Sequence, residues 1–217
     1  MLFALLSPTL KYRHSDEGII MHLVFLHGFN SSPQSLKARE TTAYLAQHAP
    51  DVTFHCPQLS PHPAAALQAL ETLLASLPAD TVLIGSSLGG FYATWLAEQH
   101  GLRAILINPA VRPYHLLSTY PGEQIHPYTG EHYTLTDDDM HTLRAHRAKQ
   151  VSPNRYWVIL GSGDEVLDWK EAVRRYDGNR LTVFNGDDHR LARWPECLPD
   201  VLAWAQAAPA TEQTVPA

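Results

Sequence analysis

One serine stands at the centre of a glycine-rich turn between an apolar run and a helical pattern. The run Thr81–Ile84 leads into Gly85-Ser86-Ser87-Leu88-Gly89, and the helical pattern continues to His100. This arrangement fits G-x-S-x-G, in which glycines allow a strand to turn sharply into a helix and expose the serine hydroxyl at the helix N-terminus. The helix dipole favours negative charge that develops there. The pattern predicts Ser87 as a nucleophile, and the alternative is a glycine-rich turn without chemistry.

A serine hydroxyl needs a base to attack at neutral pH, and a carboxylate usually orients that base. Asp164 ends the segment YWVILGSGD, just beyond an apolar run, and His189 follows the run LTVF through NGDD. Catalytic groups collect at the carboxyl ends of parallel strands. We therefore predict His189 as the general base and Asp164 as its orienting carboxylate.

Three other aspartates compete with Asp164 for that role. Asp168 is better explained as the cap of the next helix. Asp187 and Asp188 lie too near His189 in the sequence to orient its ring easily.

An oxyanion formed during acyl transfer needs two backbone N–H donors. The residue after the nucleophile, Leu88, provides the first. The segment LVFLHGFNSSP follows an early strand, and its Gly28 lets the backbone turn inward. We therefore assign the second donor to the N–H of Phe29, while a plain tight turn is the alternative explanation of this segment.

Composition limits the size of the protein and its partners. A chain of 217 residues with 45% hydrophobic and 18% charged residues can bury one sizeable core. The net charge is −6, and no run of Lys or Arg could neutralise successive phosphates, so we expect no nucleic-acid partner. The first residues lack the basic start and small-residue cleavage site of a signal peptide. No stretch approaches the ~20 apolar residues that span a bilayer, so we expect no membrane span.

The cysteines and histidines form no metal motif. Cys56 and Cys197 are far apart and belong to no CxxC pair, which favours a reducing cytoplasm. The 13 histidines show no H-E-x-x-H or comparable spacing, so we assign no metal. The segment GSSLGG lacks both the lysine of a P-loop and a dinucleotide fingerprint, and we predict no cofactor.

Apolar runs alternate with helical patterns along most of the chain, which predicts a doubly wound, mostly parallel sheet with helices on both faces. The expected strands are Leu23–Leu26, Val52–Cys56, Thr81–Ile84, Ala104–Ile107, Tyr156–Leu160 and Leu181–Phe184. The expected helices are Pro33–Gln47, Pro63–Leu77, Leu88–His100, Asp168–Tyr176 and Trp194–Gln206.

One long segment, about residues 111–151, interrupts this alternation and ends in an expected helix over Asp137–Gln150. It leaves the sheet at the edge that holds Ser87, so we expect a cap over the nucleophile. Its tyrosines Tyr120, Tyr128 and Tyr133 are not spaced as one helix face, and we assign them as walls of the substrate pocket. Packing of the insertion onto the domain is the alternative role.

The chain resembles the YqiA-like group of small single-domain esterases. The similarity runs from Leu23 to Trp204 through LHGFNSSPQSLKA, GSSLGGFYATWLA, INPAVRPYHLL, HPYTGEHYTL and GSGDEVLDW. It implies a minimal α/β-hydrolase that cleaves carboxylic esters or thioesters with the residues assigned above. The histidine loop departs from the group, since GDDHRLARW stands where a Gly-Gly-Asn/Asp-His run is expected.

We expect a single domain over residues 21–207, a disordered extension over residues 1–20 and a disordered tail over residues 208–217. The expected partner is a small acyl ester or thioester; the oligomeric state is not predicted. An acyltransferase or peptidase could use the same triad. A catalytically silent scaffold could retain the fold for binding.

Overall fold

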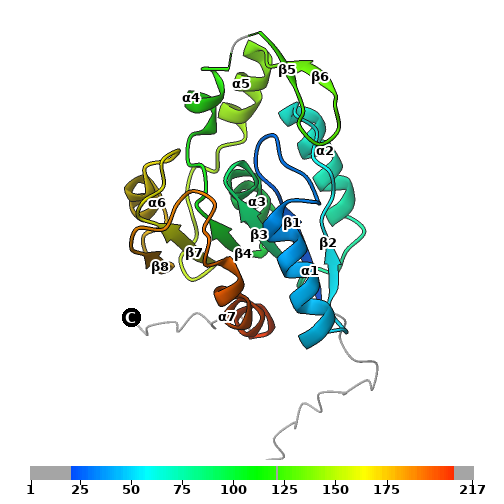
Figure 1. Cartoon of the computed structure of the whole chain (residues 1–217), viewed down its shortest axis with the longest axis vertical. Helices are drawn as coiled ribbons and strands as arrows, with labels where there is room; N and C mark the ends of the chain where they lie inside the picture. Colours follow the sequence, from blue (N-terminus) through cyan, green and yellow to red (C-terminus); the bar gives the residue numbers. More distant parts are fainter. Residues whose placement is uncertain (1–20, 121, 208–217) are drawn as a thin grey trace, which may run out of the picture.

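The computed structural model describes residues 21–120 and 122–207. Within them, six strands form one parallel sheet in the order β2-β1-β3-β4-β7-β8 (Figure 1). These strands are β1 (His22–Leu26), β2 (Thr53–His55), β3 (Val82–Ser86), β4 (Arg103–Ile107), β7 (Tyr156–Gly161) and β8 (Arg180–Phe184). All six expected strands are therefore confirmed. The expected extension over residues 1–20 and the tail over residues 208–217 lie outside the described residues.

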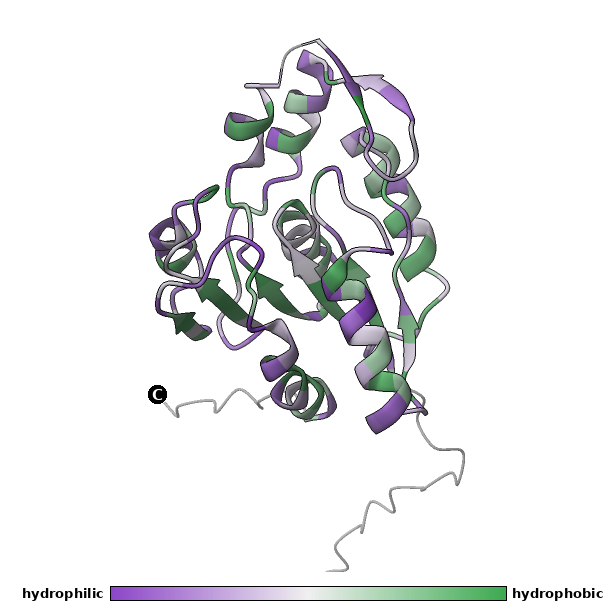
Figure 2. Cartoon of the chain, viewed as in Figure 1, coloured by the Kyte–Doolittle hydropathy of each residue, from purple (hydrophilic) through white to green (hydrophobic). Residues whose placement is uncertain are grey.

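Helices cover both faces of the sheet (Figure 1). One face holds α1 (Leu36–His48) and α7 (Trp194–Gln206), and the other holds α2 (Pro63–Leu74), α3 (Leu88–His100) and α6 (Trp169–Arg175). Alternation along β1 shows why two layers are needed, because Leu23 and Phe25 pack towards α1 and α7 whereas Val24 packs towards α2 and α3. Figure 2 shows the resulting layer of hydrophobic strands between the helices.

The ends of three helices differ from the sequence-based expectation by more than one residue. Helix α1 begins at Leu36 rather than Pro33, because the hydroxyl of Ser32 accepts the N–H of Gln34 and forms a turn before the helix. Helix α2 ends at Leu74, three residues earlier than expected. The helix expected over Asp137–Gln150 ends at Ala145.

The long segment between β4 and β7, which we call the cap segment, contains α4 (Pro113–Leu117), an antiparallel hairpin and α5 (Asp137–Ala145). The hairpin pairs β5 (Glu123–Ile125) with β6 (His132–Thr134). In Figure 1 these elements lie together at the top of the molecule. The contacts that hold the segment to the domain include two near the loop of Phe29: His62 Nδ1 lies 3.2 Å from Asp139 Oδ1, and the hydroxyl of Tyr133 donates to Asn30 Oδ1 at 2.7 Å.

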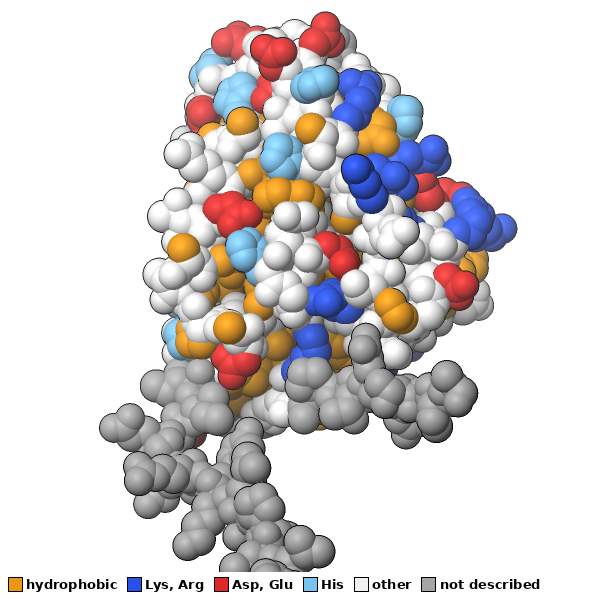
Figure 3. Space-filling view, turned by 180° about the vertical axis from the view of Figure 1, so that it is seen from behind, with side chains coloured by type: hydrophobic (Ala, Val, Ile, Leu, Met, Phe, Trp, Pro, Cys, Tyr) orange, Lys and Arg blue, Asp and Glu red, His pale blue; other side chains and the backbone are white. Residues whose placement is uncertain are grey.

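Charged side chains of both signs share the surface (Figure 3). Lys and Arg gather towards one side of that view, and carboxylates lie among them. Ion pairs join such groups around α6, where Arg174 contacts Asp168 and Arg112 contacts Glu171. No helix in the described part of the chain is long and apolar enough to cross a membrane.

Candidate active site

Ser87 lies in a sharp turn between β3 and α3. Its backbone has φ 55° and ψ −118°, a conformation that L-residues rarely adopt. The turn leaves no space for a side chain at position 89, because a Cβ added to Gly89 would lie 1.9 Å from the carbonyl oxygen of Leu26. The Ser87 N–H donates to Ile107 O at 3.0 Å, and the Ser87 carbonyl accepts from Ala110 N at 3.0 Å. The end of β4 thus holds the strained turn in place.

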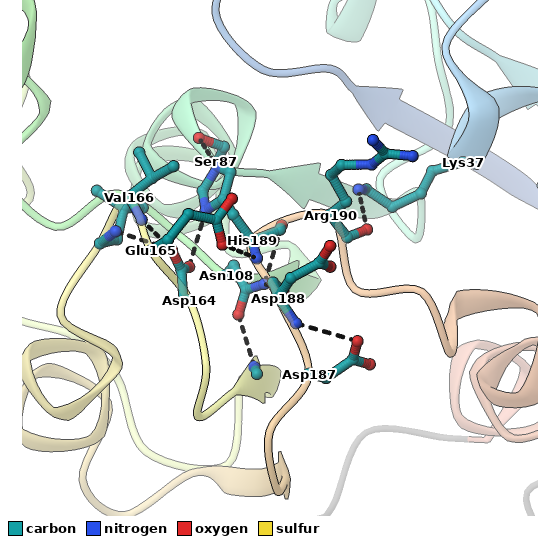
Figure 4. A network of polar contacts seen from close by, with 12 residues as sticks. Lys37, Ser87, Asn108, Asp164, Glu165, Val166, Asp187, Asp188, His189 and Arg190 are labelled. Atoms are coloured by element: carbon teal, nitrogen blue, oxygen red, sulfur yellow. Dashed lines mark hydrogen bonds and ion pairs between the residues drawn. The ribbon is translucent and has the colours of Figure 1, made fainter.

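The three residues assigned to the triad lie in one hydrogen-bonded series (Figure 4). His189 Nε2 is 3.1 Å from Ser87 Oγ, and His189 Nδ1 is 2.7 Å from Asp164 Oδ2. Because the carboxylate accepts the Nδ1 proton, Nε2 is left to accept the proton of the serine hydroxyl. The series therefore has the polarity that activation of Ser87 requires.

Asp164 is fixed from its other side. Its Oδ1 accepts the backbone N–H groups of Val166 and Leu167, each at 2.8 Å, and its side chain is 1% exposed. These two donors occupy the oxygen that does not face His189. The carboxylate can therefore neither rotate away nor turn to water without losing hydrogen bonds.

The other aspartates have different contacts. Asp168 caps α6 by accepting the N–H of Lys170 at 3.0 Å. Asp187 accepts backbone N–H groups from its own loop and from the residues just before α7. Asp188 faces the cavity beside His189, and its Oδ1 is buried without a hydrogen-bond partner among the described residues. Of these four carboxylates, Asp164 is the one that contacts the imidazole ring.

Phe29 and Leu88, whose backbone N–H groups were assigned to the oxyanion, line the same cavity as Ser87 and His189. Neither N–H has a hydrogen-bond acceptor within residues 21–120 and 122–207. The loop that carries Phe29 lies against the serine, since a Cβ on Gly28 would be 3.3 Å from Ser87 Cβ. Two unpaired N–H groups close to a serine hydroxyl are the kind of donors that an oxyanion hole requires.

The side chain of His27 holds the loop that carries Phe29 in place. It is 3% exposed; its Nδ1 donates to Gly28 O at 2.9 Å, and its Nε2 accepts Leu59 N–H at 3.1 Å. Burial lowers the pKa of His27. The neutral ring is also the form that can accept from Leu59, so His27 acts as a structural support.

A cavity of about 670 Å³ opens at Ser87 and His189. Helix α4 and the segment after it form one wall, and the start of α1 and the histidine loop form another. Tyr120 and Tyr128 line this cavity, and Tyr128 is 53% exposed. Tyr133 is not among the residues that line it: the residue is 4% exposed, and its ring packs edge-on against Phe29.

The sequence interpretation missed two residues beside the triad. Asn108, at the end of β4, is buried and hydrogen-bonded to the carbonyl groups of Asp188 and His189. Glu165 accepts the backbone N–H of His189 at 3.0 Å, and this hydrogen bond lowers the pKa of Glu165. Only its position in the sequence could have pointed to Asn108, because it follows an apolar strand at the edge of the sheet where Asp164 also lies.

No group of three or more potential metal ligands occurs in the described part of the chain.

Comparison with known proteins places the chain in a family. Residues 22–206 match the family described as "Uncharacterised protein family (UPF0227)". The chain belongs to this family. The match spans nearly the same residues as the resemblance found in the sequence and confirms it. Within the UPF0227 family, this member has the parallel sheet, the serine turn and the cap segment described above.

Solved structures of hydrolases share the fold of this UPF0227 protein. Mouse alpha/beta hydrolase domain-containing protein 10 is similar with a TM-score of 0.65 and 16% identity, over 86% of this chain and 90% of that chain. Est1E from Butyrivibrio proteoclasticus, solved with ferulic acid bound, has a TM-score of 0.63 and 15% identity, over 85% and 89% of the two chains. The esterase domain of a Rhodothermus marinus protein has a TM-score of 0.61 and 19% identity, over 88% of both. The fold is that of the α/β-hydrolases.

Proposed function

We propose that this protein is a serine hydrolase that cleaves carboxylic esters or acyl thioesters through an acyl-enzyme on Ser87. The observation that carries the proposal is the series Ser87, His189, Asp164, which opens into a cavity lined by Phe29 and Leu88, whose N–H groups have no partner among the described residues. The esterases among the structural neighbours support the same class of substrate. The free thiols of both cysteines support a cytoplasmic location.

The first half-reaction forms the acyl-enzyme. Ser87 Oγ bonds to the carbonyl carbon while its proton moves to His189 Nε2. The carbonyl oxygen becomes an oxyanion that accepts from the N–H groups of Phe29 and Leu88. The bond to the leaving alcohol or thiol then breaks, and the Nε2 proton passes to that group. Asp164 stabilises the imidazolium that exists between these two steps.

The second half-reaction releases the acid. Water attacks the acyl carbon and gives its proton to Nε2, and that proton returns to Ser87 Oγ when the acyl–oxygen bond breaks. An alcohol or amine acceptor in place of water would give acyl transfer instead. Measuring hydrolysis beside transfer to an added alcohol separates these outcomes.

Active-site labelling tests the nucleophile. We expect a fluorophosphonate probe to label the wild type at Ser87, and Ser87→Ala to abolish both labelling and hydrolysis of p-nitrophenyl esters. Loss of the nucleophile should reduce kcat by several orders of magnitude, of order 10⁶ in a comparable triad. The matched control is Ser86→Ala, since Ser86 also borders the cavity.

Two results would contradict the proposal. Labelling that survives Ser87→Ala but disappears in Ser86→Ala would move the nucleophile to the neighbouring serine. A folded wild type that neither reacts with the probe nor cleaves any ester or acyl-CoA thioester in a chain-length panel would favour a silent scaffold.

A further inference from the structure

The side chain of Asn108 lies where three segments meet: the end of β4, the end of β7 and the loop that carries His189. Its Oδ1 accepts the N–H of Gly161 at 2.8 Å, and its Nδ2 donates to Asp188 O at 3.1 Å and His189 O at 3.0 Å (Figure 4). The opposite orientation of the amide would place donor against donor at Gly161. Both amide hydrogens of Asn108 are therefore donated to carbonyl groups of the histidine loop, and the residue is 2% exposed.

The surroundings of Asn108 leave little freedom to this arrangement. The residue has φ 41°, a left-handed conformation that asparagine tolerates better than most residues, and its own N–H donates to Ile159 O at 3.0 Å. The histidine loop lies directly on the end of β7, since a Cβ added to Gly161 would lie 2.4 Å from Asp187 O. Asn108 thus connects a rigid sheet edge to a loop already in close contact with it.

The backbone of His189 is held on both sides. Asn108 binds its carbonyl group, and Glu165 Oε2 accepts its N–H at 3.0 Å. Only two side-chain torsions separate this backbone from Nε2, which must remain near Ser87 Oγ while Nδ1 contacts Asp164. A displacement of about 1 Å at a reacting group can reduce the rate roughly 100-fold.

We propose that Asn108 is a positioning residue that sets the place of His189 through the backbone of the histidine loop. It does not touch the substrate and carries no proton in the reaction. The kinetic part of this inference rests on the proposed hydrolase function; the structural part, that Asn108 keeps His189 Nδ1 on Asp164, does not.

The test is the isosteric variant Asn108→Asp. It keeps the acceptor for Gly161 N–H and suits the positive φ, but it replaces the two donated hydrogen bonds with a carboxylate oxygen facing two carbonyl groups. We expect kcat to fall about 100-fold and KM to change much less, because the base is displaced while the cavity walls at α4 and at the start of α1 stay in place. The kcat is taken on the pH plateau, so that a shifted pKa of the base is separated from the loss of rate.

Asn179→Asp is the matched control. Asn179 holds the opposite end of β7, where its Oδ1 accepts Tyr156 N–H at 2.9 Å and Arg155 N–H at 3.1 Å. Its Nδ2 has no hydrogen-bond partner within the described residues. The same substitution there keeps both contacts and adds the same charge, so we expect kcat within about twofold of the wild type, a margin below ~0.5 kcal/mol of barrier.

A second readout does not depend on ester hydrolysis. The downfield proton resonance of His189 Nδ1–H reports its hydrogen bond to Asp164; we expect it to broaden or vanish in Asn108→Asp and to persist in Asn179→Asp. Asn108→Gly, which also suits the positive φ, replaces the aspartate variant if the latter does not fold, and the same loss is expected.

The inference is overturned if the wild type is active and the folded Asn108 variants retain kcat within about threefold, well short of the expected loss. It is also overturned if the losses of kcat simply follow the losses of Tm across all variants, which would indicate a structural role alone. If the wild type itself is inactive, the hydrolase proposal fails, and the Nδ1–H resonance still decides whether Asn108 positions His189.

Discussion

Replacing the carboxylate of Asp164 with an amide tests its proposed role as the group that orients His189. In Asp164→Asn the amide oxygen can keep the N–H groups of Val166 and Leu167, because both bind one oxygen. The NH₂ group then faces His189 Nδ1, which at 2.7 Å must become an acceptor. The imidazole proton therefore moves to Nε2, and the base presents a donor to Ser87 Oγ instead of a lone pair.

The expected cost in rate follows from that tautomer. The equivalent change in a serine-protease triad lowers kcat by about 10⁴, which corresponds to about 5 kcal/mol of transition-state stabilisation. The fold should persist, because the retained contacts lose only the extra strength of charged acceptors, about 1 kcal/mol each. For a domain of this size, about 2 kcal/mol lowers Tm by roughly 4–8 °C.

The assay pairs initial rates on a p-nitrophenyl ester with a thermal melt of the same sample. Asp168→Asn is the control, because Asp168 caps α6 and lies in an exposed pair with Arg174. Asparagine caps a helix as well as aspartate does, so this variant should keep kcat and most of its Tm. The reasoning is refuted if Asp164→Asn retains more than about a tenth of wild-type kcat, far above the 10⁻⁴ expected, or if Asp168→Asn is the more damaged enzyme.

Three further predictions follow from the positions of individual side chains. Tyr120→Ala or Tyr128→Ala should change the ratio of kcat/KM between long and short esters, each lost methylene contact being worth about 1 kcal/mol; an unchanged ratio in both would remove them from the pocket. Tyr133→Ala should instead destabilise the fold by about 3 kcal/mol or more, and Tyr133→Phe by about 1 kcal/mol, in chemical denaturation. Burial raises the pKa of Cys56 to about 12 and that of Cys197 to about 11, so a thiol reagent at pH 8 should modify both much more slowly in the native than in the denatured protein; equal rates of labelling in the two states would contradict this.

The sheet could be predicted because its strands are buried on both faces. Strands β3 and β7 contain only buried residues, and such runs read as continuous apolar segments between helical patterns. The hairpin of the cap segment offered no such signal. Strands β5 and β6 have three residues each, and of these only Tyr133 is buried.

The sequence alone does not determine which of the three tyrosines of the cap segment, Tyr120, Tyr128 and Tyr133, line the cavity. Their spacing excluded a single helix face but did not determine which rings meet the cavity. That choice depends on how β6 lies over the loop at Phe29, where the hydroxyl of Tyr133 reaches Asn30. Tyr133 therefore links the cap segment to the loop that carries one of the two N–H donors.

The proximity of Ser87, Asp164 and His189 was predictable, whereas the contacts of Asn108 were not. Each triad residue follows a parallel strand, and the carboxyl ends of such strands meet at one edge whatever the details of their side chains. Asn108 stands at that same edge, but its partners are carbonyl groups of Asp188 and His189, 80 and 81 residues further along the chain. Every residue has a backbone carbonyl group, so the sequence does not indicate which of them a buried side chain will bind. A residue such as Asn108, whose side chain binds only backbone groups, is therefore harder to find from a sequence than the proposed base itself.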